Sequence, residues 1–341
     1  MSVYFVLEEF MMQKFNAGII GTGSNLPEKV MTNFDLEKIV DTSDEWIRTR
    51  TGISERRIAD EFTATSDIAS VAAKSALENA GLTADQIDLI LVATVTPDMA
   101  FPSTACFVQK NIGAMNATAF DLGAGCSGFI YGLSVANSFI SSGIYKNVLV
   151  IGAETLSKVI NWEDRNTCVL FGDGAGAAVV SRVEENSGIL SIQLGANGNH
   201  AGLITEPAGG SRTPVTHEVL DKKLNTIHME GSEVFKLAIR TMGAVSEDVI
   251  KESGLTVNDL SLVIPHQANQ RIIDGIFKRL NVPKEKSHLN LEKYGNTSAA
   301  SIPIALDEAS RQGKLKKGDN LLMVAFGSGL TWGAAIIKWV K

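Results

Sequence analysis

Short apolar runs rich in valine and isoleucine alternate along this chain with amphipathic stretches. The runs are short and apolar at nearly every position, a pattern that predicts buried strands. They lie at residues 89–95, 147–151, 177–180, 262–264, 321–325 and 334–339. Residues 66–80 and 270–280 instead have apolar positions at helical spacing. Alternating strands and helices predict an α/β fold built in layers.

The chain also repeats itself. The tripeptide Gly-Leu-Thr precedes an apolar run at 81–83 and again at 254–256, so the two copies differ in number by 254 − 81 = 173. The segments that begin at Asn147 and Asn320 resemble each other at the same spacing, 320 − 147 = 173, which we call the repeat offset. Two matches at one offset predict a duplicated α/β unit. A site that serves both halves would lie where their strand ends meet.

The repeat suggests how the chain is divided. We expect one half at 16–185 and a second at 186–341, after an N-terminal extension at 1–15. The extension is apolar but contains two glutamates and has no basic residues before it, so it does not predict a signal peptide. The polar stretch 195–214, which contains glycine and proline, predicts a long surface loop.

Composition narrows the class of protein. Hydrophobic residues make up 45% of the chain and charged residues 20%, as in globular proteins with large cores. The net charge of -7 argues against general nucleic-acid binding. The three cysteines are too few and too scattered for a disulfide framework, and no Cys/His cluster predicts a zinc site. No run approaches the roughly 18 uninterrupted apolar residues of a membrane span. We therefore expect a cytoplasmic protein that acts without a membrane.

One cysteine has surroundings suited to catalysis. Cys126 lies in the sequence Gly-Ala-Gly-Cys-Ser-Gly-Phe, and an apolar helical pattern follows it. A thiol on a sharp turn at a helix N-terminus is expected to have a lowered pKa, and its backbone N–H can help to bind an oxyanion. The alternative is an inert cysteine in a tight packing turn. Cys106 and Cys168 lack such a turn and are expected to be core residues.

Three further segments carry candidate polar groups. His266 lies between a predicted strand and a predicted helix, at the edge where α/β proteins place their sites. Asn296 lies in a turn that falls near the Cys126 turn in the repeat register (126 + 173 = 299). The glycine-rich turn 325–333 can present a second oxyanion N–H. Each segment has an ordinary alternative, respectively a core histidine, a helix cap and a hairpin. Thiol, imidazole and amide together predict a catalytic site.

In this order the four segments resemble the β-ketoacyl-acyl-carrier-protein synthase III family, which has the thiolase fold. The motifs are AGCSGF, PHQANQR, YGNTSAAS and FGSGLTWG, together with TSDEWIRTRTGI and NWEDRNT, and the resemblance covers residues 17–339. It implies duplicated α/β halves in αβαβα layers and an acyltransferase that initiates fatty-acid synthesis. In such a reaction a short acyl-coenzyme A, acetyl by default, acylates the cysteine. Decarboxylative condensation with malonyl-acyl carrier protein then gives 3-ketoacyl-carrier protein. No metal or redox cofactor is implied, because decarboxylation of the malonyl group supplies the carbanion, and acyl-coenzyme A is a substrate rather than a cofactor.

The resemblance assigns roles to individual residues. Cys126 matches the nucleophile, and His266 with Asn296 matches the pair that supports decarboxylation. The backbone N–H groups of Cys126 and Ser328 would form the oxyanion hole. The family commonly has glycine at the second position, and serine preserves the N–H unless its backbone needs a positive φ.

The resemblance also implies a coenzyme A site. Trp46 and Arg165 match residues that sandwich the adenine, and Arg50 matches one that meets the phosphates. Asn269 would lie near the same site. An indole face and a guanidinium suit a flat base, and arginine suits phosphate.

Four residues are matched to the acyl pocket and to protein partners. Phe101 matches a residue that reaches into the partner subunit's acyl pocket, which implies a homodimer. Leu330 stands where relatives commonly have an aromatic residue, and we expect it to reshape the pocket toward branched or longer acyl groups. Lys236 and Arg271 match a basic patch for the carrier protein, which would explain how a chain of net charge -7 binds an acidic partner. The alternative is an ordinary solvated basic face.

Other interpretations of these motifs stay open. A degradative thiolase is disfavoured because no cysteine follows Cys168. A hydroxymethylglutaryl-type or polyketide-type synthase is possible, although the segments around Trp46 and Arg165 favour the initiating type. A cysteine hydrolase would share the thiol and the imidazole but release a free acid. A silent acyl-binding or scaffold protein would keep the fold without turnover.

Overall fold

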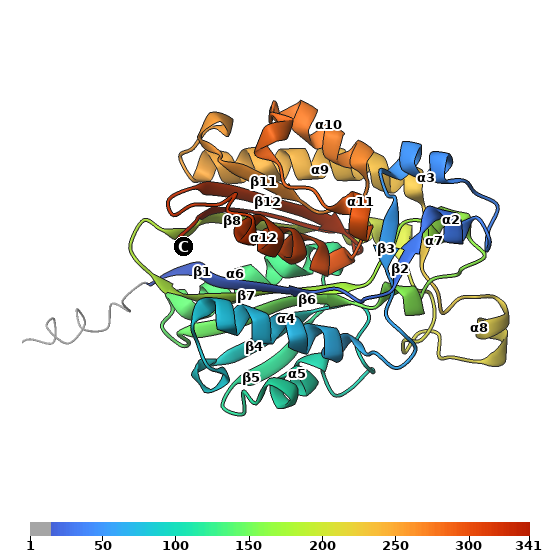
Figure 1. The fold of residues 1–341 in the computed structure, drawn as a ribbon, viewed down its shortest axis with the longest axis horizontal. Coiled ribbons are helices and arrows are strands. Elements are labelled where there is room, and N and C mark those ends of the chain that lie inside the picture. The colour runs from blue at the N-terminus through green and yellow to red at the C-terminus, as the bar shows by residue number, and fades with distance from the viewer. Residues whose placement is uncertain (1–14) are drawn as a thin grey trace, which may run out of the picture.

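Two β-sheets dominate the computed structural model, which describes residues 15–341 (Figure 1). The first sheet has the order β1-β7-β6-β4-β5, and the second has the order β11-β12-β13-β8. The strands of the first are β1 (Asn16–Asn25), β4 (Leu89–Ala93), β5 (Thr118–Leu122), β6 (Asn147–Glu154) and β7 (Gly174–Val183). Those of the second are β8 (Gly188–Ala196), β11 (Leu262–Pro265), β12 (Asn320–Gly327) and β13 (Thr331–Lys338). Every apolar run of the sequence that predicted a strand overlaps one of them.

The two sheets repeat one arrangement. β1, β7, β6 and β4 have the same order and the same directions as β8, β13, β12 and β11: two antiparallel pairs and then a parallel pair. β6 and β12 are separated by the repeat offset at both ends (320 − 147 and 327 − 154). The expected duplicated α/β fold is confirmed. We propose that the two halves divide near residue 185, in the connection between β7 and β8.

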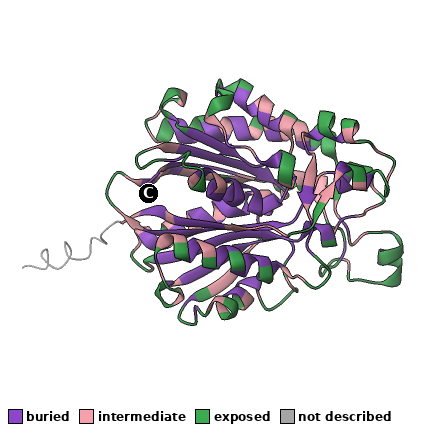
Figure 2. Ribbon diagram, viewed as in Figure 1, coloured by how far each residue is buried: buried purple, intermediate pink, exposed green. Residues whose placement is uncertain are grey.

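Helices separate the sheets and cover their outer faces (Figure 1). The central layer holds α6 (Gly128–Ser141) and α12 (Ser301–Arg311), whose first residues are again separated by the repeat offset (301 − 128). The outer helices are α4 (Thr65–Ala80) and α5 (Thr104–Ile112) on the first sheet, and α9 (Gly231–Glu252) and α10 (Gln270–Leu280) on the second. Burial follows these layers, because the inner strands of both sheets and α12 are largely buried, while the edge strand β5 and the outer helices are partly exposed (Figure 2). The five αβαβα layers agree with the expected architecture.

Short elements complete the chain. They are β2 (Val30–Thr32), α2 (Asn33–Leu36), α3 (Asp44–Thr51), β3 (Glu55–Arg57), α7 (Arg165–Cys168), β9 (Ile204–Thr205), α8 (His217–Asp221), β10 (His228–Met229) and α11 (Leu291–Tyr294). Within residues 15–341, none of the helices combines the length and the apolar character that a membrane crossing demands. The predicted extension at 1–15 lies outside the described residues except for Phe15.

Two expectations from the sequence are wrong. The stretch 195–214 is not one long loop, because β8 ends inside it and β9 pairs with β10. Cys106 is exposed on this chain, since the buried face of α5 is formed by Thr104, Ala105 and Val108. Cys168, by contrast, is fully buried as expected.

Candidate active site

Cys126 lies between the end of β5 and the start of α6, inside a short 3₁₀ turn, η2 (Gly125–Ser127). The thiol therefore sits at the N-terminal end of a central helix. Small residues make this turn possible. Gly125 has φ +53°, which favours glycine. A Cβ atom added at Gly327 would lie 2.5 Å from the backbone nitrogen of Cys126. The end of β12 therefore packs directly on the cysteine.

The protonation of Cys126 differs from the sequence-based expectation. The pKa of the thiol is raised to about 11, chiefly by burial; the Ser298 hydroxyl lowers it, and the charge of Glu154 contributes to the increase. The helix N-terminus therefore does not make this thiol acidic in the structure. The expectation of a lowered pKa was wrong because the site is poorly solvated and contains a carboxyl group.

A matching turn of the second half faces the cysteine. This turn, η7 (Ser298–Ala300), follows η2 by the repeat offset (298 − 125) and precedes α12 as η2 precedes α6. Asn296 lies two residues before the start of this turn. Its backbone is held in place because its N–H donates to Leu170 O and its carbonyl accepts from Gly172 N. Its side-chain Oδ1 accepts a hydrogen bond from Ser298 N at 2.8 Å. Since the oxygen is occupied, the amide Nδ2 is the end left to bind a ligand.

His266 follows directly on β11 and is 2% exposed. Its backbone N–H donates to Val324 O at 2.8 Å, which holds it beside β12. Its ring Nδ1 lies 2.6 Å from Ser301 Oγ at the start of α12. Burial lowers the pKa of the imidazole to about 3, so His266 is neutral at pH 7. Within residues 15–341, Nε2 makes no hydrogen bond, which leaves it available to a substrate.

Ser328 completes the group from the glycine-rich turn. Ser328 is not among the described non-glycine residues whose φ is positive, so a serine fits the backbone at this position. A Cβ atom on Gly125 would lie 2.9 Å from Ser328 N, which places that nitrogen against the Cys126 turn. The side-chain Oγ points elsewhere and donates to Ile204 O at 2.9 Å. Both N–H groups of the expected oxyanion hole thus come from adjoining turns.

Glu154 is a residue of the site that sequence reasoning missed. It ends β6, is fully buried, and accepts hydrogen bonds from Thr96 Oγ1 at 2.6 Å and Thr94 Oγ1 at 3.1 Å. The Ser298 hydroxyl interacts with this carboxyl as well as with the Cys126 thiol. Burial raises the pKa of Glu154 to about 7. An acidic residue that ends an apolar strand at the carboxyl edge of a parallel pair was the signal that could have found it.

Trp46, Arg50, Arg165 and Asn269 gather on one exposed patch although three separate elements carry them. The guanidinium carbon of Arg50 lies 4.8 Å from the Trp46 ring centroid, and that of Arg165 lies 5.2 Å from it. Asn269 caps α10 through Arg271 N at 2.9 Å and donates from Nδ2 to Arg50 O at 3.1 Å. An aromatic ring flanked by two cations suits a flat, anionic ligand.

The remaining predicted residues fall in three other environments. Phe101 is 85% exposed, in the loop before α5. Leu330 is buried and makes backbone hydrogen bonds with Asn197 in both directions. Lys236 and Arg271 are exposed on neighbouring helices, and the Arg271 guanidinium lies 5.4 Å from the Phe235 ring centroid. Lys236 pairs with a glutamate on its own helix.

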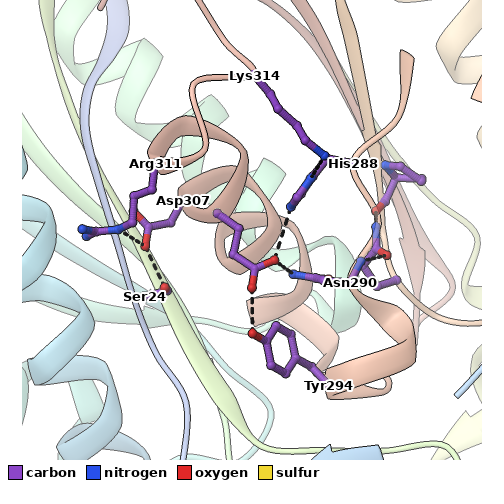
Figure 3. Close-up of polar contacts among 10 residues, drawn as sticks. Ser24, His288, Asn290, Tyr294, Asp307, Arg311 and Lys314 are labelled. Carbon is purple, nitrogen blue, oxygen red and sulfur yellow. Dashed lines mark hydrogen bonds and ion pairs between the residues drawn. The ribbon is translucent and has the colours of Figure 1, made fainter. Parts of the chain in front are cut away.

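Two successive carboxylates hold α12 in place (Figure 3). Asp307 accepts a hydrogen bond from Ser24 Oγ of the first half at 2.7 Å. Glu308 accepts from Tyr294 Oη at 2.7 Å and from Asn290 Nδ2 at 2.9 Å. The helix whose first turn reaches the site is thereby tied to both halves. No group of three or more potential metal-binding side chains occurs in this described part of the chain.

Comparison with known proteins agrees with this architecture. Residues 120–198 match the family model for 3-oxoacyl-[acyl-carrier-protein] synthase III, and residues 250–339 match the model for its C-terminal part. A β-ketoacyl-[acyl-carrier-protein] synthase III from Caldanaerobacter subterraneus subsp. tengcongensis is 63% identical over 331 residues, or 97% of this chain and 100% of that protein.

Solved structures are similar over the same length. A 3-oxoacyl-[acyl-carrier-protein] synthase III from Aquifex aeolicus superposes with a TM-score of 0.88 at 54% identity, covering 95% of this chain and 100% of that one. The priming β-ketosynthase of the R1128 polyketide pathway has a TM-score of 0.89 at 34% identity, covering 96% and 98%. Fold and relatives together define a thiolase-fold condensing enzyme of the acyltransferase type. Within that class, the chain belongs to the β-ketoacyl-acyl-carrier-protein synthase III family.

Proposed function

We propose that this enzyme condenses a short acyl-coenzyme A, acetyl by default, with malonyl-acyl carrier protein through an acyl-Cys126 intermediate. The products are 3-ketoacyl-carrier protein, coenzyme A and carbon dioxide, and the reaction initiates fatty-acid synthesis. One observation carries the assignment of roles: the thiol lies at a helix start, and the second half leaves two groups available as donors, Asn296 Nδ2 beside the facing turn and His266 Nε2 at the end of β11. The identity of 63% to a family member supports the reaction class.

The first half-reaction is a thioester exchange. The Cys126 sulfur attacks the acyl carbonyl carbon, the bond to the coenzyme A sulfur breaks, and the thiol proton leaves with coenzyme A. The N–H groups of Cys126 and Ser328 stabilise the oxyanion of the tetrahedral intermediate. Because the pKa of the free thiol is raised to about 11, we expect deprotonation to accompany attack rather than precede it.

The second half-reaction is decarboxylative. The bond between the malonyl carbon and its carboxylate breaks, and the electron pair passes into an enolate. Nε2–H of His266 and Nδ2–H of Asn296 hydrogen-bond to the enolate oxygen. The enolate carbon attacks acyl-Cys126, the carbon–sulfur bond breaks, and the thiolate takes up a proton from solvent, which the overall reaction consumes. A neutral His266 suits this role because a neutral imidazole can donate from one nitrogen without carrying charge into the site. Loss of carbon dioxide supplies the carbanion, so the scheme needs no metal or redox cofactor.

The substrate sites follow from the surface. We assign Trp46, Arg50, Arg165 and Asn269 to coenzyme A. A base stacked between two groups needs about 7 Å, twice the ~3.5 Å contact distance. Since Arg165 lies 5.2 Å from the Trp46 centroid, it has to swing outward when adenine enters. Lys236 and Arg271 would receive the carrier protein. Phe101 would enter the acyl pocket of a second subunit, and Leu330 would shape the pocket. The cytoplasmic location stays a prediction.

Intact-protein mass spectrometry after brief incubation with acetyl-coenzyme A, followed by peptide mapping, tests this function. The expected result is one acetyl group on Cys126 that is discharged only when malonyl-carrier protein is added. An adduct formed only with a branched primer would change the substrate and keep the mechanism. The absence of an adduct with any acyl-coenzyme A would contradict the proposal and favour a silent acyl-binding protein.

A further inference from the structure

We propose that Ser301 is a positioning residue that fixes His266 in the Nε2–H tautomer. The inference rests on the proposed function for its catalytic meaning, although the tautomer can be measured without any reaction. The His266 ring has two nitrogens, and the proposed decarboxylation needs the proton on the one that faces the substrate. The hydrogen bond made by the other nitrogen selects the tautomer.

The geometry at Ser301 decides the direction of that hydrogen bond. Ser301 Oγ lies 2.6 Å from His266 Nδ1, and Gln267 N lies 3.4 Å from the same oxygen. A backbone N–H can only donate, so Ser301 Oγ accepts from Gln267. Nδ1 is the only other hydrogen-bond partner of Ser301 Oγ within residues 15–341, so it is the one acceptor available to the hydroxyl proton. This arrangement leaves Nδ1 unprotonated and places the ring proton on Nε2.

The opposite direction would leave a buried proton without an acceptor. If Nδ1–H donated to Ser301 Oγ, the serine would accept two hydrogen bonds and its own proton would point at no acceptor within residues 15–341. Ser301 is 2% exposed, as is His266, so bulk water does not reach the pair. An unsatisfied buried donor is unfavourable, and native structures avoid it.

The backbone around this pair is held by further hydrogen bonds. The Gln267 side chain donates from Nε2 to Pro265 O at 2.7 Å and accepts at Oε1 from Asn290 N at 3.3 Å. Asn290 is in turn bound to α12 through Glu308 (Figure 3). The Gln267 N–H that orients the serine is therefore fixed by the same helix that begins with Ser301.

The duplication supplies an internal comparison. Shifted by the repeat offset, Ser301 corresponds to Gly128 and His266 corresponds to Ala93. These positions also adjoin in the first half, because a Cβ atom on Gly128 would lie 2.8 Å from Ala93 Cβ. The fold thus brings the two positions together in both halves, but only the second half has a hydroxyl and an imidazole there.

Nitrogen-15 NMR of the histidine-labelled full-length enzyme tests the inference directly. The expected spectrum shows His266 with protonated Nε2 and unprotonated Nδ1 near pH 7. In Ser301→Ala a second population with protonated Nδ1 is expected, and Ser301→Thr is expected to restore the single tautomer. A wild-type spectrum dominated by the Nδ1–H form would overturn the proposal even if no variant folds.

Kinetics gives the second readout. In Ser301→Ala we expect kcat for condensation to fall about tenfold, less than for loss of the imidazole, because part of the ring population keeps its Nε2 proton. The rate at which acetyl-coenzyme A acylates Cys126 should change less than twofold, and Ser301→Thr should recover most of kcat. Tyr294→Phe is the matched control, since it removes a hydrogen bond to α12 away from His266. A kcat for condensation in Ser301→Ala equal to that of the wild type would refute the positioning role. A wild-type enzyme that forms no acyl-Cys126 would refute the proposed function instead and leave the NMR result standing.

Discussion

The two halves of the molecule share a fold but differ at every position that carries chemistry. Cys126 corresponds to Ala299, and Glu154 corresponds to Gly327, after a shift by the repeat offset. In the other direction, His266 corresponds to Ala93, Asn296 to Gly123 and Ser301 to Gly128. Each polar residue of one half thus has a small counterpart in the other. Two similar turns can approach closely only if one residue of each facing pair is small. At Gly152, for example, an added Cβ atom would clash with Ala299 O. The first half therefore supplies the thiol, and the second supplies the hydrogen-bond donors.

The largest effect should come from the first half. Cys126→Ala should lower acylation and condensation by at least about 10⁴-fold, because no other group can hold the acyl chain. Mass spectrometry after incubation with acetyl-coenzyme A measures the acylation. Cys106→Ala is the control, since this exposed thiol lies on α5 and should leave acylation unchanged. Acetylation that persists in Cys126→Ala would mean that the nucleophile lies elsewhere.

Substitutions in the second half should separate the two steps. His266→Ala and Asn296→Ala should reduce steady-state condensation by about 10²- to 10⁴-fold, because each removes a donor to the enolate. Formation of acyl-Cys126 should stay within a few-fold of wild type, as followed by rapid quenching and mass spectrometry. If these variants acylate as poorly as Cys126→Ala, the halves do not divide the chemistry as described.

Gly327, the second-half counterpart of Glu154, packs against the Cys126 turn, and a methyl group added there should disturb the contact between the halves. In Gly327→Ala the new Cβ would lie 2.5 Å from Cys126 N, so the free energy of unfolding should fall by about 3 kcal/mol. Chemical denaturation with matched m-values measures the change. Gly202→Ala serves as the control because nothing lies within 4 Å of the added atom, and its effect should stay below about 0.5 kcal/mol. Equal stabilities of the two variants would show that the turns are not tightly packed.

The smallest effect concerns the charge beside the thiol. Since the pKa of Cys126 is about 11, its alkylation by iodoacetamide should accelerate about tenfold per pH unit from pH 8 to pH 10. Glu154→Gln removes a negative charge that opposes the thiolate, so it should lower the thiol pKa and raise the alkylation rate a few-fold at pH 8. A rate that reaches a plateau below pH 8 would show that the helix N-terminus outweighs burial.

The sequence allowed most of the core to be predicted, because buried strands are apolar and the repeat was visible at one constant offset. β1, β5 and β8 were missed since their sequences, NAGIIGTGSN, TAFDL and GILSIQLGA, mix glycine or polar residues into edge strands. The stretch 195–214 was wrongly predicted because β9 and β10 are only two residues long and are stabilised by pairing across a long loop.

Within the site, residue identity was easier to infer than electrostatics. Motif order pointed to Cys126, His266 and Asn296, and the structure places all three at the ends of strands or at helix starts. The protonation of the thiol could not be inferred, because it depends on burial and on Glu154, which comes from a distant strand. Ser301 was also missed, since a serine at a helix start has no sequence pattern that distinguishes a tautomer-selecting hydroxyl from an ordinary one.

A single-turnover experiment tests the central claim that the two halves divide the reaction. Acetyl-Cys126 enzyme is prepared from wild type and from His266→Ala, freed of coenzyme A, and mixed with malonyl-carrier protein, and 3-ketoacyl-carrier protein and carbon dioxide are measured over time. This division of the chemistry predicts rapid discharge by the wild type and retention of the acetyl group by His266→Ala. Discharge of both acetyl-enzymes at the same rate would contradict it.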